Sequence, residues 1–362
     1  MATASGGHPH RLPDTGHSVP PARRFTMSGH VTTVLGPVPA DQLGRVMPHE
    51  HLLSLTPGPW LTGGTRADAV DRAVESLAGL RELGFGTVVD LSPYGVAGRD
   101  ADGGNVGLLT EISRRSGLHI VSGTSIYLES YSPGWTLEAD LDALTARLIR
   151  DVEVGIGDSG VRAGVFGEQA TSLGEITAHE EKCLRAVARA QRETGLSIMT
   201  HTTHGTKAFE QLDILRSEGV DFDRVVIGHM DTQLSRELVR EVIDAGARIA
   251  IDTVGKENWD FFLEPAPDPR PDGEFVKRSF HRSDAGRADL VAWLVSLGYT
   301  DRILLAQDLT GAEVWMNPGT HGVDGYSYLG AVFVPALQER GVSEADCERL
   351  VAENPARVLE IR

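Results

Sequence analysis

Residues 45–51 read Arg45-Val46-Met47-Pro48-His49-Glu50-His51, a short apolar run that leads into two histidines separated by one residue. On a β-strand, side chains two positions apart point to the same side, so both imidazoles would aim at one point. A helix would set the two rings about 200° apart. Neutral imidazole is a good ligand for zinc and related divalent metals. The pair also fits two ordinary surface or core histidines, so its meaning depends on the rest of the chain.

The bulk composition is that of an ordinary globular protein. Of the 362 residues, 41% are hydrophobic and 23% are charged. The net charge of −17 disfavours nucleic acid and anionic membrane as partners, because both bind a basic surface. No run approaches the length of a transmembrane helix, and two cysteines make no disulfide framework. We therefore predict a cytoplasmic protein, and the charge says little about a small-molecule substrate.

The N-terminal residues differ from the rest of the chain. Residues 1–27 are rich in Gly, Pro, Ser, His and Arg, and they lack the apolar segment of a secretory signal. We predict a disordered extension over residues 1–27. Because no linker interrupts the remainder, residues 28–362 are predicted to form a single domain.

Eight short apolar strands alternate with helices after a small hairpin near residues 31–43. This alternation predicts parallel pairing and an α/β fold, the (β/α)8 TIM barrel, with a short N-terminal β-hairpin and long βα lid loops at 255–282 and 311–326. An open doubly wound sheet is disfavoured, because no Gly-x-Gly-x-x-Gly turn follows the first strand. The predicted strands are 45–49, 87–91, 119–124, 163–168, 196–201, 225–229, 248–252 and 302–308. The predicted helices include 106–115, 137–153, 178–194, 207–218, 235–245 and 283–297, with two more that begin near Tyr328 and at Ser343.

Side chains of metal-ligand type stand at the ends of five of these strands. In a barrel, active-site residues come from the C-terminal ends of strands, which meet at one rim. Four histidines and two carboxylates are too many for one tetrahedral zinc with an open position. They suit two metals about 3.5–4 Å apart, bridged by a carboxylate and a hydroxide. The residues are His49, His51, Glu168, His201, His229 and Asp308.

This set resembles the phosphotriesterase-like branch of the amidohydrolase superfamily. The resemblance implies that His49, His51 and Asp308 bind a first metal, that His201 and His229 bind a second, and that Glu168 bridges the two. It extends from about residue 31 to the C-terminus. It is carried by the segments from Val34-Leu35-Gly36 to His49-Glu50-His51, from Gly164 to Ser172, Thr200-His201-Thr202, Gly228-His229-Met230-Asp231, from Leu305 to Asp308, and Asn354-Pro355-Ala356-Arg357.

The bridging residue points to one subgroup of that family. The best-known phosphotriesterases use a carboxylated lysine from strand four, but none of the four lysines of this chain lies there. Glu168 takes that place, as in the glutamate-bridged phosphotriesterase homology and phosphotriesterase-related (resiniferatoxin-binding) proteins. Lactonase relatives carry an arginine soon after the Asp of strand seven, where this chain has Thr253-Val254. The resemblance therefore favours N-acyl amides or carboxyl esters over lactones and phosphotriesters as substrates.

The expected activity is that of a binuclear metal-dependent hydrolase. A metal-bridging hydroxide would attack an ester, lactone, amide or phosphoester centre, and Asp308 would accept and relay the proton. Tyr127, just beyond strand three, would bind the substrate or the hydroxide. Zinc is the preferred metal, with Mn²⁺, Co²⁺ and Fe²⁺ as alternatives. A homodimer is expected from the family alone.

Two rival interpretations stay open from the residues. One is a non-catalytic protein that binds metals and a small ligand on the same barrel. The other is a metal-free aldolase, which would need a Schiff-base lysine that no strand end carries. Among other residues, Glu50 is expected to face the outer layer of the barrel, and Asp90 and Asp252 are expected to bind loop backbone. Asp231 is expected to orient a ligand, to shuttle protons or to cap a helix, and Lys256 to contact substrate from a lid.

Overall fold

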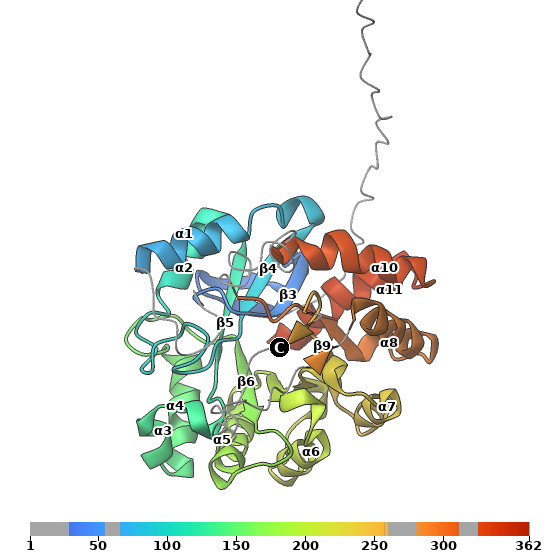
Figure 1. Cartoon of the computed structure of the whole chain (residues 1–362). Coiled ribbons are helices and arrows are strands. Elements are labelled where there is room, and N and C mark those ends of the chain that lie inside the picture. Colours follow the sequence, from blue (N-terminus) through green and yellow to red (C-terminus); the bar gives the residue numbers. More distant parts are fainter. Residues whose placement is uncertain are drawn as a thin grey trace, which may run out of the picture.

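The computed structural model describes residues 29–54, 66–256, 258–259, 280–281, 283–310 and 325–361. Eight parallel strands lie in sequence order around a ring, and the helices surround it (Figure 1). The predicted (β/α)8 barrel is confirmed. The strands are β3 (Arg45–Glu50), β4 (Phe85–Asp90), β5 (His119–Thr124), β6 (Val165–Thr171), β7 (Ile198–Thr202), β8 (Val225–Ile227), β9 (Arg248–Ile251) and β12 (Ile303–Leu305).

The outer helices bury one face each against the strands. In α5, for example, Thr177 and Glu180 form a capping box at the start and Gly195 ends the helix in the left-handed conformation. Its apolar side chains, among them Leu184 and Val187, are fully buried. The helices are α1 (Arg66–Ser76), α2 (Leu108–Ser116), α3 (Gly134–Glu138), α4 (Leu141–Glu153), α5 (Ala178–Thr194), α6 (Ala208–Ser217), α7 (Arg236–Asp244), α8 (Asp284–Ser296), α10 (Val334–Glu339), α11 (Glu344–Glu348) and α12 (Asn354–Leu359).

An apolar layer fills the inside of the barrel. Each of the eight strands contributes one buried side chain to it, and the N-terminal hairpin and α12 pack on the same cluster. Apolar packing therefore occupies the barrel interior below the strand ends, and polar side chains gather at the C-terminal rim. The strand residues of this layer are Val46, Val89, Val121, Val165, Met199, Val226, Ala250 and Leu304.

The predicted hairpin is confirmed as an antiparallel pair. It consists of β1 (His30–Thr33) and β2 (Gly36–Pro39). His30 also pairs with Ile361, so the described chain ends lie side by side. Two further short strands, β10 (Asn258–Trp259) and β11 (Phe280–His281), form a separate antiparallel pair.

Two predicted strands end earlier than their sequence pattern indicates. The sixth and eighth strands were placed at 225–229 and 302–308, but β8 ends at Ile227 and β12 at Leu305. His229 and Asp308 lie beyond them with φ of 56° and 49°. This left-handed backbone is uncommon outside glycine, and residues that adopt it cluster at functional sites.

The predicted helix 137–153 is wrong at its start, because it is two helices. Ala139 is extended between α3 and α4, and Asp140 begins α4 by accepting a hydrogen bond from the Ala143 N–H. A short side-chain acceptor of this kind competes with continued helix and starts a new one. The helix predicted to begin at Ser343 does begin there, with Ser343 as its N-cap.

Several predictions lie outside the described residues. These are the disordered extension 1–27 and most of the two lid loops, 255–282 and 311–326. The division of the chain at residue 28 remains a prediction. Within the described ranges, no helix combines the length and apolar character needed to cross a membrane.

The first and last strands meet at a seam that Glu50 closes. The N–H of Asp308 donates to the His49 carbonyl over 3.0 Å, and the N–H of His51 donates to the Leu309 carbonyl over 3.0 Å. The Glu50 carboxylate accepts from the N–H groups of Gln307 and Leu309, over 3.0 and 2.8 Å. Glu50 is fully buried, so it joins two strands rather than facing the outer layer as predicted.

We predict that Glu50→Gln destabilises the barrel by about 1–3 kcal/mol. The substitution replaces one of the two accepting oxygens with an NH₂ group, so a buried backbone N–H then points at another donor and loses its hydrogen bond. Urea unfolding followed by circular dichroism measures the change. Glu82→Gln, at an exposed position, is the matched control and should stay within about 0.5 kcal/mol of the wild type. An equal effect of the two substitutions would contradict the role assigned to the seam.

Candidate metal centre

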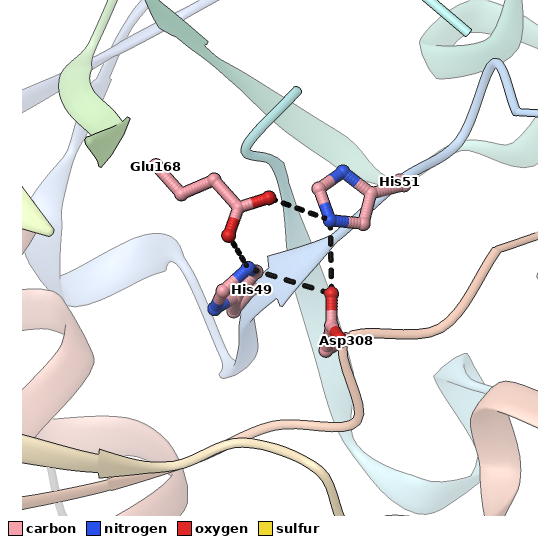
Figure 2. A group of neighbouring side chains, drawn as sticks. All are labelled: His49, His51, Glu168 and Asp308. Atoms are coloured by element: carbon pink, nitrogen blue, oxygen red, sulfur yellow. Dashed lines mark hydrogen bonds and ion pairs between the residues drawn. The ribbon is translucent and has the colours of Figure 1, made fainter. Parts of the chain in front are cut away.

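Four side chains from three strands converge at one point on the rim (Figure 2). Nε2 of His51 lies 2.9 Å from Oδ1 of Asp308 and 3.3 Å from Oε1 of Glu168. Nε2 of His49 lies 3.6 Å from the same Asp308 oxygen and 3.5 Å from Oε2 of Glu168. All four side chains are buried. We call His49, His51, Glu168 and Asp308 the first group.

Glu168 also belongs to a second group. Its Oε2 lies 2.9 Å from Nδ1 of His201 and 3.6 Å from Nε2 of His229. Those two histidine nitrogens are 2.7 Å apart. The structure thus brings all six sequence-predicted ligands together, with one carboxylate shared between the second group (Glu168, His201 and His229) and the first.

The arrangement fits metal ions. Within the described residues, the buried Nε2 of His49 has no hydrogen-bond partner, although two carboxylates lie 3.5–3.6 Å away. Burying a polar nitrogen without a partner is costly unless something else satisfies it. Imidazole nitrogens and carboxylate oxygens are ligands that zinc and related divalent ions accept. These buried groups could therefore hold metal ions.

Asp252 fixes one histidine of each group. It follows β9, and its Oδ2 accepts from Nδ1 of His49 over 2.8 Å. Its Oδ1 accepts from Nδ1 and from the backbone N–H of His229, over 2.9 and 2.8 Å. With Nδ1 protonated and held, each ring presents the lone pair of Nε2 to the centre. The prediction that Asp252 binds loop backbone is therefore incomplete.

Two hydroxyl groups hold the other histidines. Nδ1 of His51 lies 3.0 Å from Ser92 Oγ, and Nε2 of His201 lies 3.2 Å from Thr203 Oγ1. His201 therefore faces the centre through Nδ1, whereas the other three histidines face it through Nε2. Every histidine of the set has one nitrogen toward the centre and one on the protein.

Charge is concentrated in this small volume. Burial alone would lower the pKa of His49, but Asp252 and Glu168 outweigh it and raise the pKa to about 10. Burial would also lower the pKa of His229, but Asp252 and Glu168 outweigh it and raise this pKa to about 10. His201 differs, because burial and the neighbouring His229 lower its pKa. Burial would raise the pKa of Glu168, but hydrogen bonds from the surrounding histidines hold it well below its usual value.

Tyr127 lies against the second group. Its hydroxyl is 3.4 Å from Nδ1 of His201, and the two rings meet edge to face with centroids 5.0 Å apart. Burial, followed by the charge of Glu168, raises the pKa of Tyr127 well above its usual value. The phenol therefore stays protonated and can donate a hydrogen bond at the centre.

Lys256 lies against the first group instead of extending from a lid. Its Nζ is 2.8 Å from Oδ2 of Asp308, and it also donates to the Asp308 carbonyl. The buried Arg287 of α8 holds the turn that carries Lys256, because it donates to the Lys256 carbonyl and to Thr253 Oγ1, each over 2.8 Å. The same guanidinium binds Asp231 over 2.6 Å. Asp231 is thus part of this buried network. Ser235 caps the following helix, so the predicted capping role of Asp231 is wrong, whereas its role in orienting a ligand or shuttling protons stays a prediction.

The sequence did not predict that Asp252, Ser92 and Thr203 hold ligand histidines. Asp252 carries a usable signal, since it is an acidic strand end on the rim where the ligands lie. Ser92 and Thr203 are ordinary loop residues whose contacts depend on tertiary structure. Asp90, in contrast, behaves as predicted, because its carboxylate accepts from the Leu52 N–H over 2.8 Å.

Comparisons with known proteins agree with this geometry. The phosphotriesterase family model matches residues 29–359. The phosphotriesterase homology protein of Escherichia coli (strain K12) is 28% identical over 320 residues, which cover 88% of this chain and 99% of that protein. The N-acetyltaurine hydrolase of Salmo salar is 29% identical over 369 residues, covering 93% of this chain and 99% of that protein.

A solved structure of a phosphotriesterase homology protein also matches this chain. The crystal structure of the phosphotriesterase homology protein from Escherichia coli, complexed with phosphate in its active site, aligns with a TM-score of 0.73 at 27% identity. The alignment covers 88% of this chain and 99% of that chain. The family resemblance predicted from the sequence is confirmed.

We predict that Lys256→Met destabilises the metal-free protein by about 3 kcal/mol, because it removes a buried positive charge from Asp308. Added Zn²⁺ should reduce this difference, since a bound cation supplies the missing charge. Thermal unfolding in chelator and in Zn²⁺ measures both values. Lys207→Met, which breaks a surface pair with Glu210, is the control and should cost less than about 1 kcal/mol. A Lys256→Met penalty that is equal in chelator and in Zn²⁺ would contradict this prediction.

Proposed function

This chain belongs to the phosphotriesterase family, and from that membership we propose that it is a hydrolase with a binuclear metal centre. The observation that carries the proposal is the position of Glu168, whose carboxylate lies between the two histidine groups: Oε1 faces His51, and Oε2 faces His49 on one side and His201 on the other. A carboxylate shared between two ligand groups is the arrangement expected for two bridged metal ions.

Each of the six ligands is assigned to one of the two proposed metal ions or to both. His49, His51 and Asp308 would hold the first divalent ion, and His201 and His229 the second, with Glu168 between them. Zn²⁺ is the preferred ion, and Mn²⁺, Co²⁺ and Fe²⁺ suit the same nitrogen and oxygen donors. When bound, the two ions would supply an activated water and a positive charge that stabilises the developing oxyanion.

The side chains of this protein would move the protons and orient the substrate. Asp308 faces the centre through Oδ1, so this oxygen can accept the proton of the attacking water. Lys256 holds the other oxygen, Oδ2, and so fixes the carboxylate in that orientation. Tyr127 would donate its phenol proton as a hydrogen bond to the substrate.

The proposed substrate class is a small N-acyl amide or carboxyl ester. It is supported by relatives named for the hydrolysis of N-acetyltaurine, and by Glu168 in the place of a bridging lysine. We further propose a cytoplasmic homodimer with residues 28–362 as its folded domain. The reducing compartment is supported by two buried free cysteines, Cys183 and Cys347. A protein that only binds metals and a ligand is the rival, and hydrolase relatives do not favour it.

Removal of the metals tests the activity. We expect chelator treatment to abolish hydrolysis and Zn²⁺, Mn²⁺ or Co²⁺ to restore it, as measured on N-acetyltaurine, other N-acyl amino compounds, carboxyl esters, lactones and phosphotriesters. Full activity in chelator would contradict a metal-dependent reaction. Two bound metals with tight ligand binding but no hydrolysis in any class would favour the rival.

Asp308→Asn tests the proton acceptor. We expect kcat to fall at least about 100-fold, because an amide cannot accept the proton, while the metal content stays near that of the wild type. Steady-state kinetics and elemental analysis of the same sample give both numbers. Asp301→Asn, at an exposed site near the opposite end of β12, is the control. Wild-type turnover in Asp308→Asn would refute the role of this carboxylate.

A further inference from the structure

Among the described carboxylates outside the six proposed ligands, Asp252 is the one that holds a histidine from each ligand group. We propose that it is a positioning residue that couples the two halves of the centre, so that metal binding at one half favours binding at the other. The inference rests on the proposed function, because it assumes that both groups bind metal. The inference concerns whether the two metals bind cooperatively, and the identity of the six ligands alone does not determine this.

The contacts make Asp252 one rigid clamp for two rings. It is fully buried, Oδ2 holds His49, and Oδ1 holds both the ring and the backbone N–H of His229. The rings of His49 and His229 lie 5.2 Å apart at 31° to one another. A rotation of this short side chain would therefore move both rings together.

Coupling follows from that shared clamp. A metal in the first group fixes the ring of His49, which fixes the Asp252 carboxylate, which in turn holds His229 ready for the second metal. Coupling between two binding sites is reciprocal, so a metal in the second group must favour the first by the same factor. A partner that orients a ligand histidine typically contributes 10–100-fold to metal affinity.

The two hydroxyl partners provide a contrast, because each serves one group. Ser92 donates its proton to the Ala97 carbonyl and Thr203 donates its proton to the Thr171 carbonyl, over 3.3 and 2.8 Å. Each hydroxyl oxygen therefore accepts from its imidazole. Ser92→Ala should lower the intrinsic metal affinity of the first group, and Thr203→Val that of the second.

Substituting Asp252 by Asn should affect the two groups unequally. Two N–H donors of His229 point at the Oδ1 position, so the amide oxygen stays there. The amide NH₂ then faces Nδ1 of His49, which can no longer donate and must accept. That tautomer places a proton on Nε2 and removes the lone pair that His49 would offer a metal. Asp252→Asn should therefore disable the first group, whereas Asp252→Ala weakens both.

The experiment titrates the metal-free full-length protein with Zn²⁺ against a competing chelator and counts bound zinc by elemental analysis. The wild type should bind two ions with positive cooperativity and little singly loaded protein. Asp252→Asn should keep about one ion per chain, and anomalous diffraction at the zinc edge should place it at His201 and His229. Asp252→Ala should weaken both steps by 10–100-fold and reduce the cooperativity of binding.

A matched substitution controls for damage to the barrel. Asp151→Asn changes another fully buried carboxylate, in α4, whose partners are Tyr94, Thr124 and Arg147. It should leave zinc content and cooperativity unchanged. Circular dichroism of each metal-free variant reports folding independently of metal.

Several results would overturn the coupling. They are independent binding of two ions by the wild type, fewer than two ions bound, unchanged zinc affinity in both Asp252 variants, or retention of the first-group ion in Asp252→Asn. If neither Asp252 variant folds, the coupling is tested on the wild type alone. It then requires cooperative zinc binding and histidine ¹⁵N spectra in which Nδ1 of His49 and Nδ1 of His229 both carry a proton. A protein that loads two ions cooperatively yet hydrolyses nothing would refute the proposed function and leave the coupling intact.

Discussion

The burial of three carboxylates at the mouth of an apolar barrel is the constraint on which the rest of this structure depends. Glu168, Asp252 and Asp308 are almost without solvent, and desolvated negative charge is costly unless positive groups surround it. The imidazoles of His49, His51 and His229 and the ammonium of Lys256 supply those groups here, and His201 adds a hydrogen bond to Glu168. The cluster is therefore balanced by residues from six strand ends, and it can form only where those ends meet.

Buried polar contacts around the cluster keep those strand ends in place. Glu50 joins the first strand to the last through backbone N–H groups, and Arg287 ties the turn after β9 to the loop after β8. Neither side chain touches the centre. Each fixes a backbone segment that carries a residue of the cluster, which is how outer contacts give precise geometry to inner ones.

Much of the fold and of the ligand set could be predicted because both follow local rules. Alternating apolar strands and amphipathic helices indicate the barrel, and its rim collects strand-end residues such as His201. The early ends of β8 and β12 could not be predicted, because the left-handed backbone of His229 and Asp308 is imposed by tertiary contacts. The same holds for Lys256, whose partner Asp308 lies 52 residues away in sequence. A sequence pattern predicts which residues lie at the rim, but it does not predict which side chains they contact there.

The seam between the first and last strands has a consequence for synthesis of the chain. His51 and Asp308 are 257 residues apart, and they meet only after the eighth strand has closed the ring. A growing polypeptide that still lacks its last strand cannot assemble the first group, although it already carries His201, His229 and Glu168. Under the proposed two-metal arrangement, the full metal complement would be acquired only after the barrel is complete, and ribosome-bound or truncated chains would retain at most the second group.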